Sequence, residues 1–322
     1  MRRRTFVAGL GVVAAWHRCA FAEQTRTIPR LGILLSNSPQ TDPIAPLIQG
    51  LRAAGYIDGE TLSIEYRYAE GKRDRLAGLA AELVQLNPNV IFAYGGDVAP
   101  HAKQATASIP VVVMVSNDPI QSGLVTSTQH PGANVTGISL VYDELAGKLL
   151  ELLKEAMPAI SRVAVLWNPD HADPEFRETQ KVAAARGIQL QSLEVRQPND
   201  FDGAFRAAIA ARPEALIIVS SRLLLTQRQQ IADFINTARI PAVGSWGDWA
   251  KAGLLFTYGP NIEDAMHGIA VYVVKILKGS RPGDLPIERP SRFELAVNMK
   301  TAQSLEINLP DSIIARADKV IE

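Results

Sequence analysis

Small polar residues, with aromatic residues among them, recur where the short apolar runs of this chain end. They are Ser36, Asn37, Tyr94, Gly95, Gly96, Ser116, Asn117, Asp118, Asn168, Ser220, Ser221, Trp246 and Tyr258. Hydroxyl, amide and carboxylate groups hydrogen-bond charged ligands, and aromatic rings stack on apolar parts. Ser, Asn, Asp and Gly are also ordinary turn and capping residues, which is the alternative for any one position. Their recurrence favours a binding site for a small organic ligand, either amino-acid-like or aromatic.

Patterns that mark catalytic machinery are missing from the sequence. None of the five histidines, His17, His101, His130, His171 and His267, lies three or four residues from another, so no metal-binding helix is predicted. Val243 stands where the G-x-S-x-G elbow around Ser245 needs glycine. One cysteine excludes a disulfide framework and a cysteine-based metal site. We expect no catalytic residue, metal or cofactor; a hydrolase or lyase using Asp97 or Asp118 is the alternative.

Short apolar runs alternate with amphipathic stretches along the chain. Strands are predicted at 31–35, 62–67, 90–93, 109–115, 163–166, 190–195, 215–219, 240–243 and 293–297. Helices are predicted at 74–86, 98–106, 145–156, 175–186, 201–211, 224–238 and 262–277. Strands alternating with such helices imply right-handed crossovers and parallel sheets. Two rounds of the pattern predict an α/β fold with two Rossmann-like lobes, and a single ten-stranded sheet is the alternative.

Three local expectations accompany this pattern. Asp42 and Pro43 predict the cap of a first helix, whose apolar face carries residues 44, 47, 48 and 51. Residues 123–140, rich in Gly, Ser, Thr and Asn, predict a link between the lobes. Residues 222–228 predict a solvated helix face, although Arg222 lies near enough to a strand end to meet an anion.

Residues 1–22 carry four arginines and no acid, an apolar run at 6–16 and an Ala20-Phe21-Ala22 ending. This pattern predicts a secretory signal peptide, and residues 3–7 (RRTFV) resemble the twin-arginine export motif. An amphipathic helix of the domain is the alternative. The whole chain has 33 basic and 33 acidic residues, so removal of those four arginines leaves 29 against 33, a net charge of −4. We therefore expect a periplasmic protein, monomeric, that does not bind nucleic acid.

Several segments resemble one family in consistent order from about residue 30 to the end. They include 50–59 (GLRAAGYIDG), 131–137 (PGANVTG), 298–302 (NMKTA) and 315–322 (ARADKVIE). These segments resemble the tryptophan/tyrosine-type solute-binding proteins of ABC importers. Trp167 and Trp246 depart from the family pattern, so the identity of the ligand does not carry over.

The resemblance implies a type I periplasmic-binding-protein fold, with crossovers near 139–142, 256–259 and 286–293. One lobe would comprise 29–140 plus 258–286, and the other 141–257 plus 287–322. It also implies a small-molecule ligand in the cleft and a membrane permease as partner. An exported cleft enzyme and a ligand sensor subunit are the alternatives.

The strand-end residues suggest how such a ligand is held. A ligand carboxylate would meet Ser36, Ser220 or Ser221, and an ammonium group would meet Asp118. Trp246 or Tyr94 would stack on an apolar part.

Overall fold

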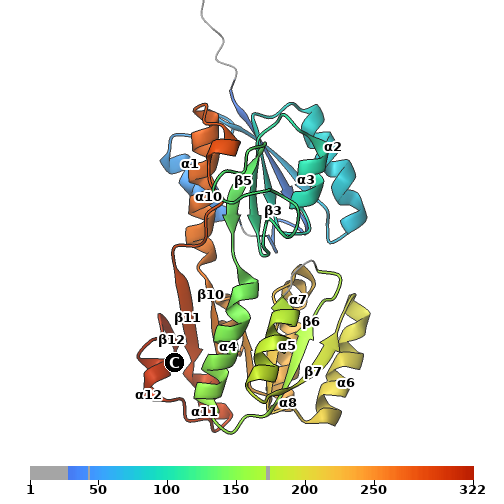
Figure 1. The fold of residues 1–322 in the computed structure, drawn as a ribbon, viewed down its shortest axis with the longest axis vertical. Coiled ribbons are helices and arrows are strands. Elements are labelled where there is room, and N and C mark those ends of the chain that lie inside the picture. Colours follow the sequence, from blue (N-terminus) through green and yellow to red (C-terminus); the bar gives the residue numbers. More distant parts are fainter. Residues whose placement is uncertain (1–27, 43, 172–174) are drawn as a thin grey trace, which may run out of the picture.

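The computed structural model describes residues 28–322 except 43 and 172–174, so the predicted signal peptide lies outside the described residues. Two lobes, each with a sheet flanked by helices, lie end to end along the long axis of the molecule (Figure 1). This arrangement confirms the predicted α/β class with two Rossmann-like lobes.

The first lobe contains a five-stranded parallel sheet in the order β2-β1-β3-β4-β5. Its strands are β1 (Arg30–Leu35), β2 (Ser63–Tyr68), β3 (Val90–Tyr94), β4 (Val111–Val115) and β5 (Val135–Ser139). Helices α1 (Ala45–Ala53) and α10 (Ile262–Leu277) pack against one face of the sheet. The other face carries α2 (Leu76–Gln85), preceded by the 3-10 turn η1 (Arg73–Arg75), and α3 (Ala99–Ala105).

Residues 123–140 were predicted to form a link between the lobes, but residues 135–139 of this segment form strand β5. Val135 and Thr136 are fully buried, and Ile138 is 4% exposed. Each residue of β5 pairs in parallel register with β4. The strand was missed because it is short and contains Gly137, which lowers its apparent strand propensity.

The second lobe contains a seven-stranded sheet in the order β12-β11-β10-β9-β8-β6-β7. Its strands are β6 (Arg162–Trp167), β7 (Gln189–Glu194), β8 (Ala215–Ile218), β9 (Ala242–Gly244), β10 (Phe256–Pro260), β11 (Phe293–Asn298) and β12 (Lys319–Ile321). All neighbouring strands are parallel except β10 and β11, which run antiparallel.

The helices of this lobe cover both faces of its sheet. They are α4 (Tyr142–Ala156), α5 (Glu175–Ala185), α6 (Phe201–Ala211), α7 (Arg222–Thr226), α8 (Arg228–Ala238), α9 (Asp248–Lys251), α11 (Met299–Ser304) and α12 (Asp311–Ile314), with the 3-10 turn η2 (Pro198–Asp200). The 3-10 turn η3 (Pro282–Asp284) follows α10 and belongs to the first lobe, where it contacts β5. The predicted helix 224–238 is therefore two helices separated at Gln227.

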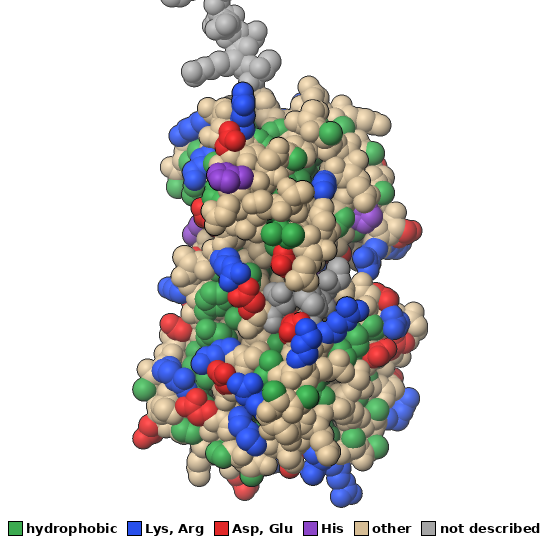
Figure 2. Space-filling view, in the orientation of Figure 1, with side chains coloured by type: hydrophobic (Ala, Val, Ile, Leu, Met, Phe, Trp, Pro, Cys, Tyr) green, Lys and Arg blue, Asp and Glu red, His purple; other side chains and the backbone are tan. Residues whose placement is uncertain are grey.

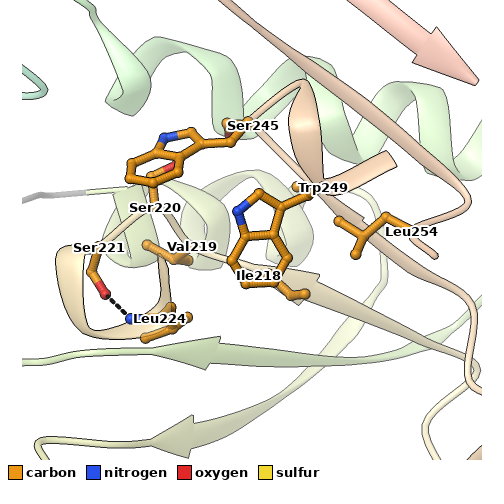
Figure 3. Close-up of a pocket in the computed structure, with 10 residues that line it drawn as sticks. Ile218, Val219, Ser220, Ser221, Leu224, Ser245, Trp249 and Leu254 are labelled. Atoms are coloured by element: carbon orange, nitrogen blue, oxygen red, sulfur yellow. Dashed lines mark hydrogen bonds between the residues drawn. The ribbon is translucent and has the colours of Figure 1, made fainter. Parts of the chain in front are cut away.

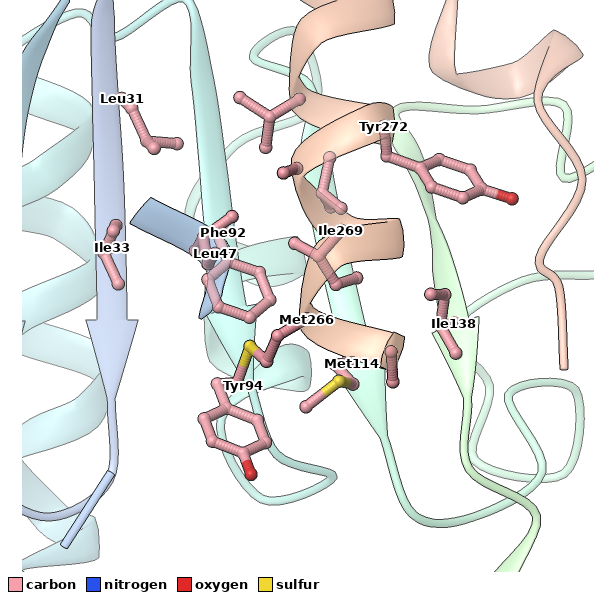
Figure 4. Packing of buried hydrophobic residues seen from close by; sticks show 14 of the residues in the cluster. Leu31, Ile33, Leu47, Phe92, Tyr94, Met114, Ile138, Met266, Ile269 and Tyr272 are labelled. Atoms are coloured by element: carbon pink, nitrogen blue, oxygen red, sulfur yellow. The ribbon is translucent and has the colours of Figure 1, made fainter. Parts of the chain in front are cut away.

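The core of the first lobe joins segments that are far apart in the chain. Met266 and Ile269 of α10 face Phe92 and Met114 of the sheet, and Tyr272 extends toward β5, which carries Ile138 (Figure 4). Burial of each such side chain contributes about 1.5–3 kcal/mol relative to exposure. This packing holds α10, which follows β10 of the other lobe, firmly on the first sheet.

The chain passes between the lobes three times: from β5 to α4, from β10 to α10, and from η3 to β11. At the first passage Val141 has a φ of +50°, a conformation that costs a β-branched residue about 1–3 kcal/mol. The chain was predicted to return to the first lobe at residue 258. Strand β10 instead stays paired with β11 of the second lobe as far as Pro260. The predicted division into lobes otherwise stays a prediction.

Gly137 offers a test of the packing of β5. A Cβ atom there would lie 1.9 Å from the Val113 carbonyl oxygen, and the φ of +144° disfavours other residues. We expect Gly137→Ala to destabilise the protein by more than about 3 kcal/mol in chemical denaturation. Gly78→Ala is the control, since this exposed α2 position has no neighbouring atom within 4 Å, and it should stabilise by about 0.5–1 kcal/mol. Equal effects of the two substitutions would contradict the observed strand packing.

Candidate ligand-binding site

The carboxyl ends of the parallel strands of both sheets point into the gap between the lobes (Figure 1). Ligands of open α/β sheets bind at such ends. Two cavities lie there. The outer cavity measures about 750 Å³ and the inner chamber about 30 Å³.

Ten of the thirteen predicted site residues line these two cavities. Ser36, Asn37 and Asn168 line the outer cavity. The inner chamber is lined by Tyr94, Gly95, Gly96, Ser116, Ser220, Ser221 and Trp246. The structure therefore brings together strand ends from both lobes, as the strand-end argument requires.

The other three predicted residues line neither cavity. Asn117 lies behind the chamber, where its side chain approaches Gly96. Asp118 accepts hydrogen bonds from the backbone N–H groups of Ile120 and Gln121 at 2.7 and 3.3 Å, as a turn-capping residue does. Tyr258 lies on β10 and packs against the hydrophobic cores of both lobes.

Polar atoms of the described residues lie buried near the cleft without a hydrogen-bond partner within the described part of the chain. They are Asn37 Nδ2, Asp97 Oδ1, Asn117 Oδ1, Ser220 Oγ and Trp246 Nε1. A buried polar group without a partner costs about 1–3 kcal/mol. Their convergence from both lobes favours a polar ligand that supplies the missing partners.

The two serines that follow β8 are fixed by different contacts. Ser221 Oγ accepts a hydrogen bond from the Leu224 N–H at 3.3 Å and caps α7 (Figure 3). The backbone N–H of Ser220 donates to Glu175 Oε2 at 3.2 Å, and the Ser245 hydroxyl donates to Glu175 Oε1 at 3.2 Å. The fully buried Glu175 carboxylate thus anchors two strand ends of the second sheet.

Arg222 is buried, which corrects the expectation of a solvated helix face at this residue. Its Nη1 lies 2.5 Å from Asp42 Oδ1, although the two residues are 180 positions apart and belong to different lobes. Its guanidinium carbon lies 3.9 Å from the centroid of the Tyr94 ring. Burial alone would lower the pKa of Arg222, but Tyr94, Asp42 and Asp97 together raise it above its usual value.

Asp42 does not cap the first helix as predicted. Helix α1 begins at Ala45, has no side-chain cap and carries Pro46 in its first turn. Asp42 Oδ2 instead accepts a hydrogen bond from the Asn37 N–H at 2.8 Å, and the Asp42 side chain is fully buried. Burial raises the pKa of Asp42, opposed by Arg222 and by the Asn37 N–H. A buried carboxylate requires a cationic partner more than a helix end requires a cap.

Charged side chains of both signs gather along the waist of the molecule (Figure 2). Arg73 Nη1 of the first lobe donates to the Asp170 carbonyl oxygen of the second lobe at 2.7 Å. The Asp170 carboxylate in turn pairs with Arg196. These exposed contacts close the rim of the outer cavity.

Sequence reasoning missed Asp42, Glu175, Arg73, Asp170 and Arg196. Arg222 was not among the predicted site residues either, but it had a sequence signal, because it directly follows Ser220 and Ser221 at a strand end.

Among residues 28–42, 44–171 and 175–322, no cluster of three potential metal ligands occurs. Within the same described residues, no helix is long and apolar enough to cross a membrane.

A family model described as ABC transporter substrate binding protein matches residues 37–321 of this chain. The chain belongs to this family. This confirms the family predicted from the sequence segments.

Relatives of this substrate-binding protein support the same assignment. It is 23% identical over 263 residues to a tyrosine-binding protein of Clostridioides difficile (strain R20291), an alignment covering 81% of this chain and 75% of the relative. A conserved domain protein from Vibrio cholerae has a similar structure, with a TM-score of 0.84, 26% identity and coverage of 91% of this chain and 99% of that chain.

Two further comparisons concern the fold of the substrate-binding protein. An ABC domain in complex with L-Trp from Streptococcus pneumonia gives a TM-score of 0.83 at 23% identity, covering 91% of this chain and 99% of that one. Periplasmic binding proteins with sugar ligands also share the fold, at 12% identity and a TM-score of 0.56 for one from Alkaliphilus metalliredigens. The predicted type I periplasmic-binding-protein fold is therefore confirmed.

The buried ion pair of this substrate-binding protein predicts an unusual double-variant result. Arg222→Met leaves Asp42 as an uncompensated buried carboxylate, which costs up to about 3–5 kcal/mol. We expect the single variant to melt at a clearly lower temperature than the double variant Asp42→Asn/Arg222→Met, measured by circular dichroism. A double variant as unstable as the single one would show that the carboxylate does not need the arginine.

Proposed function

We propose that this protein is the periplasmic solute-binding component of an ABC importer. It binds a small organic ligand of the amino-acid class between its lobes and delivers it to a membrane permease. The single observation that carries this proposal is the outer cavity of about 750 Å³, which residues of both lobes line and which includes the buried, partnerless Asn37 Nδ2 and Asp97 Oδ1. A ligand that satisfies atoms of both lobes holds them together, which couples binding to closure.

The chemistry of these atoms supports a ligand with both donors and acceptors. Asp97 Oδ1 can accept from an ammonium group, while Ser36 Oγ donates to the other carboxylate oxygen at 3.0 Å and orients the group. Asn37 Nδ2, which lines the same outer cavity, is a donor for a carboxylate. An α-amino acid carries both charged groups. The relatives named for tyrosine and for L-Trp support this class.

The permease partner and the periplasmic location in this proposal rest on the family and on the sequence of residues 1–22. A binding protein must meet its ligand outside the membrane that the importer spans. Export through a cleaved signal peptide, with a twin-arginine motif, meets that requirement.

Ligand identity is tested first by mass spectrometry of small molecules released from the purified protein and by calorimetry with an amino-acid panel. We expect Asp97→Asn to weaken binding by about 10- to 100-fold, since a hydrogen bond to a charged group contributes about 1.5–3 kcal/mol. Asp118→Asn is the matched control, because the Asp118 carboxylate caps a turn and lines neither cavity. A weaker ligand affinity of Asp118→Asn than of Asp97→Asn would reject this placement of the ligand.

Export is tested on the native protein. We expect Edman sequencing or mass spectrometry of periplasmic material to find an amino terminus at Glu23, directly after Ala20-Phe21-Ala22. Replacement of Arg3 and Arg4 by lysine should leave the uncleaved precursor in the cytoplasm. An unprocessed chain that retains Met1 in the wild-type strain would contradict export by this signal.

A further inference from the structure

The predicted site residues are divided between two cavities, and one side chain stands between them. Arg222 lines both the outer cavity and the inner chamber. The inner chamber contains the aromatic residues of the predicted site, Tyr94 and Trp246, but its volume is only about 30 Å³. That space suits about two water molecules. Without movement of Arg222, the aromatic platform cannot receive a ring.

The Arg222 side chain is held by contacts from the opposite lobe. Asp42 binds Nη1 at 2.5 Å, and the Tyr94 ring lies under the guanidinium carbon at 3.9 Å. The side chains of Arg222 and Asp42 are 10% and 0% exposed. The planar guanidinium covers a face of Tyr94 on which an aromatic ligand would stack.

Displacement of Arg222 would break the buried ion pair and leave Asp42 without its cationic partner. Asp42 would lose its ion pair, and the Asn37 N–H would be its main remaining hydrogen-bond donor. Breaking a buried pair by removing one partner is strongly unfavourable. An aromatic ligand would have to offset this loss before gaining any stacking energy.

The outer cavity, in contrast, has the size of a ligand site. Its volume of about 750 Å³ lies within the range of roughly 300–1,000 Å³ typical of ligand pockets. No phenyl, phenol or indole ring occurs among the described residues that line it. The charged residues that line it are Arg73, Arg196, Arg222, Glu70, Asp97 and Asp170. Three cationic and three acidic groups suit a ligand that carries both charges and a polar side chain.

We propose that Arg222, held by Asp42, determines the specificity of the cleft by closing the aromatic chamber, so that the ligand is a small polar amino acid bound in the outer cavity. This inference rests on the proposed function, since it narrows the ligand class of the same cleft. It predicts a preference opposite to the one that the names of the relatives suggest.

The test is calorimetry on the mature chain with four probes, L-Trp, L-Tyr, L-Ser and L-Gln. The wild type should bind at least one polar probe about tenfold or more tightly than either aromatic probe. The double variant Asp42→Asn/Arg222→Ala uncovers Tyr94 and removes the Asp42 carboxylate together with the arginine that neutralises it. It should shift this ratio by about tenfold or more toward the aromatic probes.

A second arginine–carboxylate pair supplies the matched control. Arg289 binds Glu144 through two hydrogen bonds of 2.7 and 2.8 Å, and neither residue lines the outer cavity or the inner chamber. Glu144→Gln/Arg289→Ala should leave the ratio within about twofold of the wild type. Circular dichroism checks the fold, and Asp42→Asn/Arg222→Gln, closer in size, replaces the first variant if that one does not fold.

The outcomes separate this inference from the proposed function. Wild-type protein that binds L-Trp or L-Tyr as tightly as the polar probes overturns the inference and leaves the proposed function standing. An unchanged ratio in the double variant also overturns it. A wild type silent toward all four probes counts against the amino-acid ligand, while a double variant that then gains L-Trp binding still supports closure of the chamber by Arg222. No gain in that case overturns the inference as well.

Discussion

A buried ion pair between the lobes determines how the halves of this protein meet. Asp42 and Arg222 are almost fully removed from water, and in such surroundings neither charge is tolerated without the other. Because one group belongs to the first lobe and the other to the second, the ion pair joins the two lobes across the cleft. The covered Tyr94 ring, the small inner chamber and the separate outer cavity all follow from this contact.

The cleft itself follows from the parallel topology of the two sheets. Parallel strands end at one edge of a sheet, and the three passages of the chain set these edges opposite each other. Loops at such edges satisfy few of their own polar groups, which leaves atoms such as Asp97 Oδ1 and Asn37 Nδ2 for a ligand. The polar groups of Glu175, in contrast, are used within the protein. Its carboxylate accepts hydrogen bonds from Ser220 and Ser245 and so fixes two loops of the second lobe. The second-lobe side of the cleft is thus preorganised, and the ligand that binds there can exchange.

Most strands and helices could be predicted because their signals are local. Apolar runs such as that of β4 are bounded by turn residues, and α10 carries apolar residues at helical spacing on one side. β5 escaped prediction because its burial comes from β4 and α10, which lie elsewhere in the chain, while its own composition resembles a loop. Ten of the thirteen proposed site residues reached a cavity wall because each follows a strand end. Asp118 did not, since its carboxylate is satisfied by the next turn.

The sequence by itself determined the α/β class, the two-lobed organisation, the family and the strand ends that surround the cleft. These properties depend on periodicity and on short segments, whose physical meaning is contained in a few neighbouring residues. Only the tertiary structure decided that Asp42 binds Arg222 instead of capping a helix, and that the predicted site is divided into two unequal cavities. Residues 180 positions apart share no local pattern, and their pairing arises only when folding removes both charges from water.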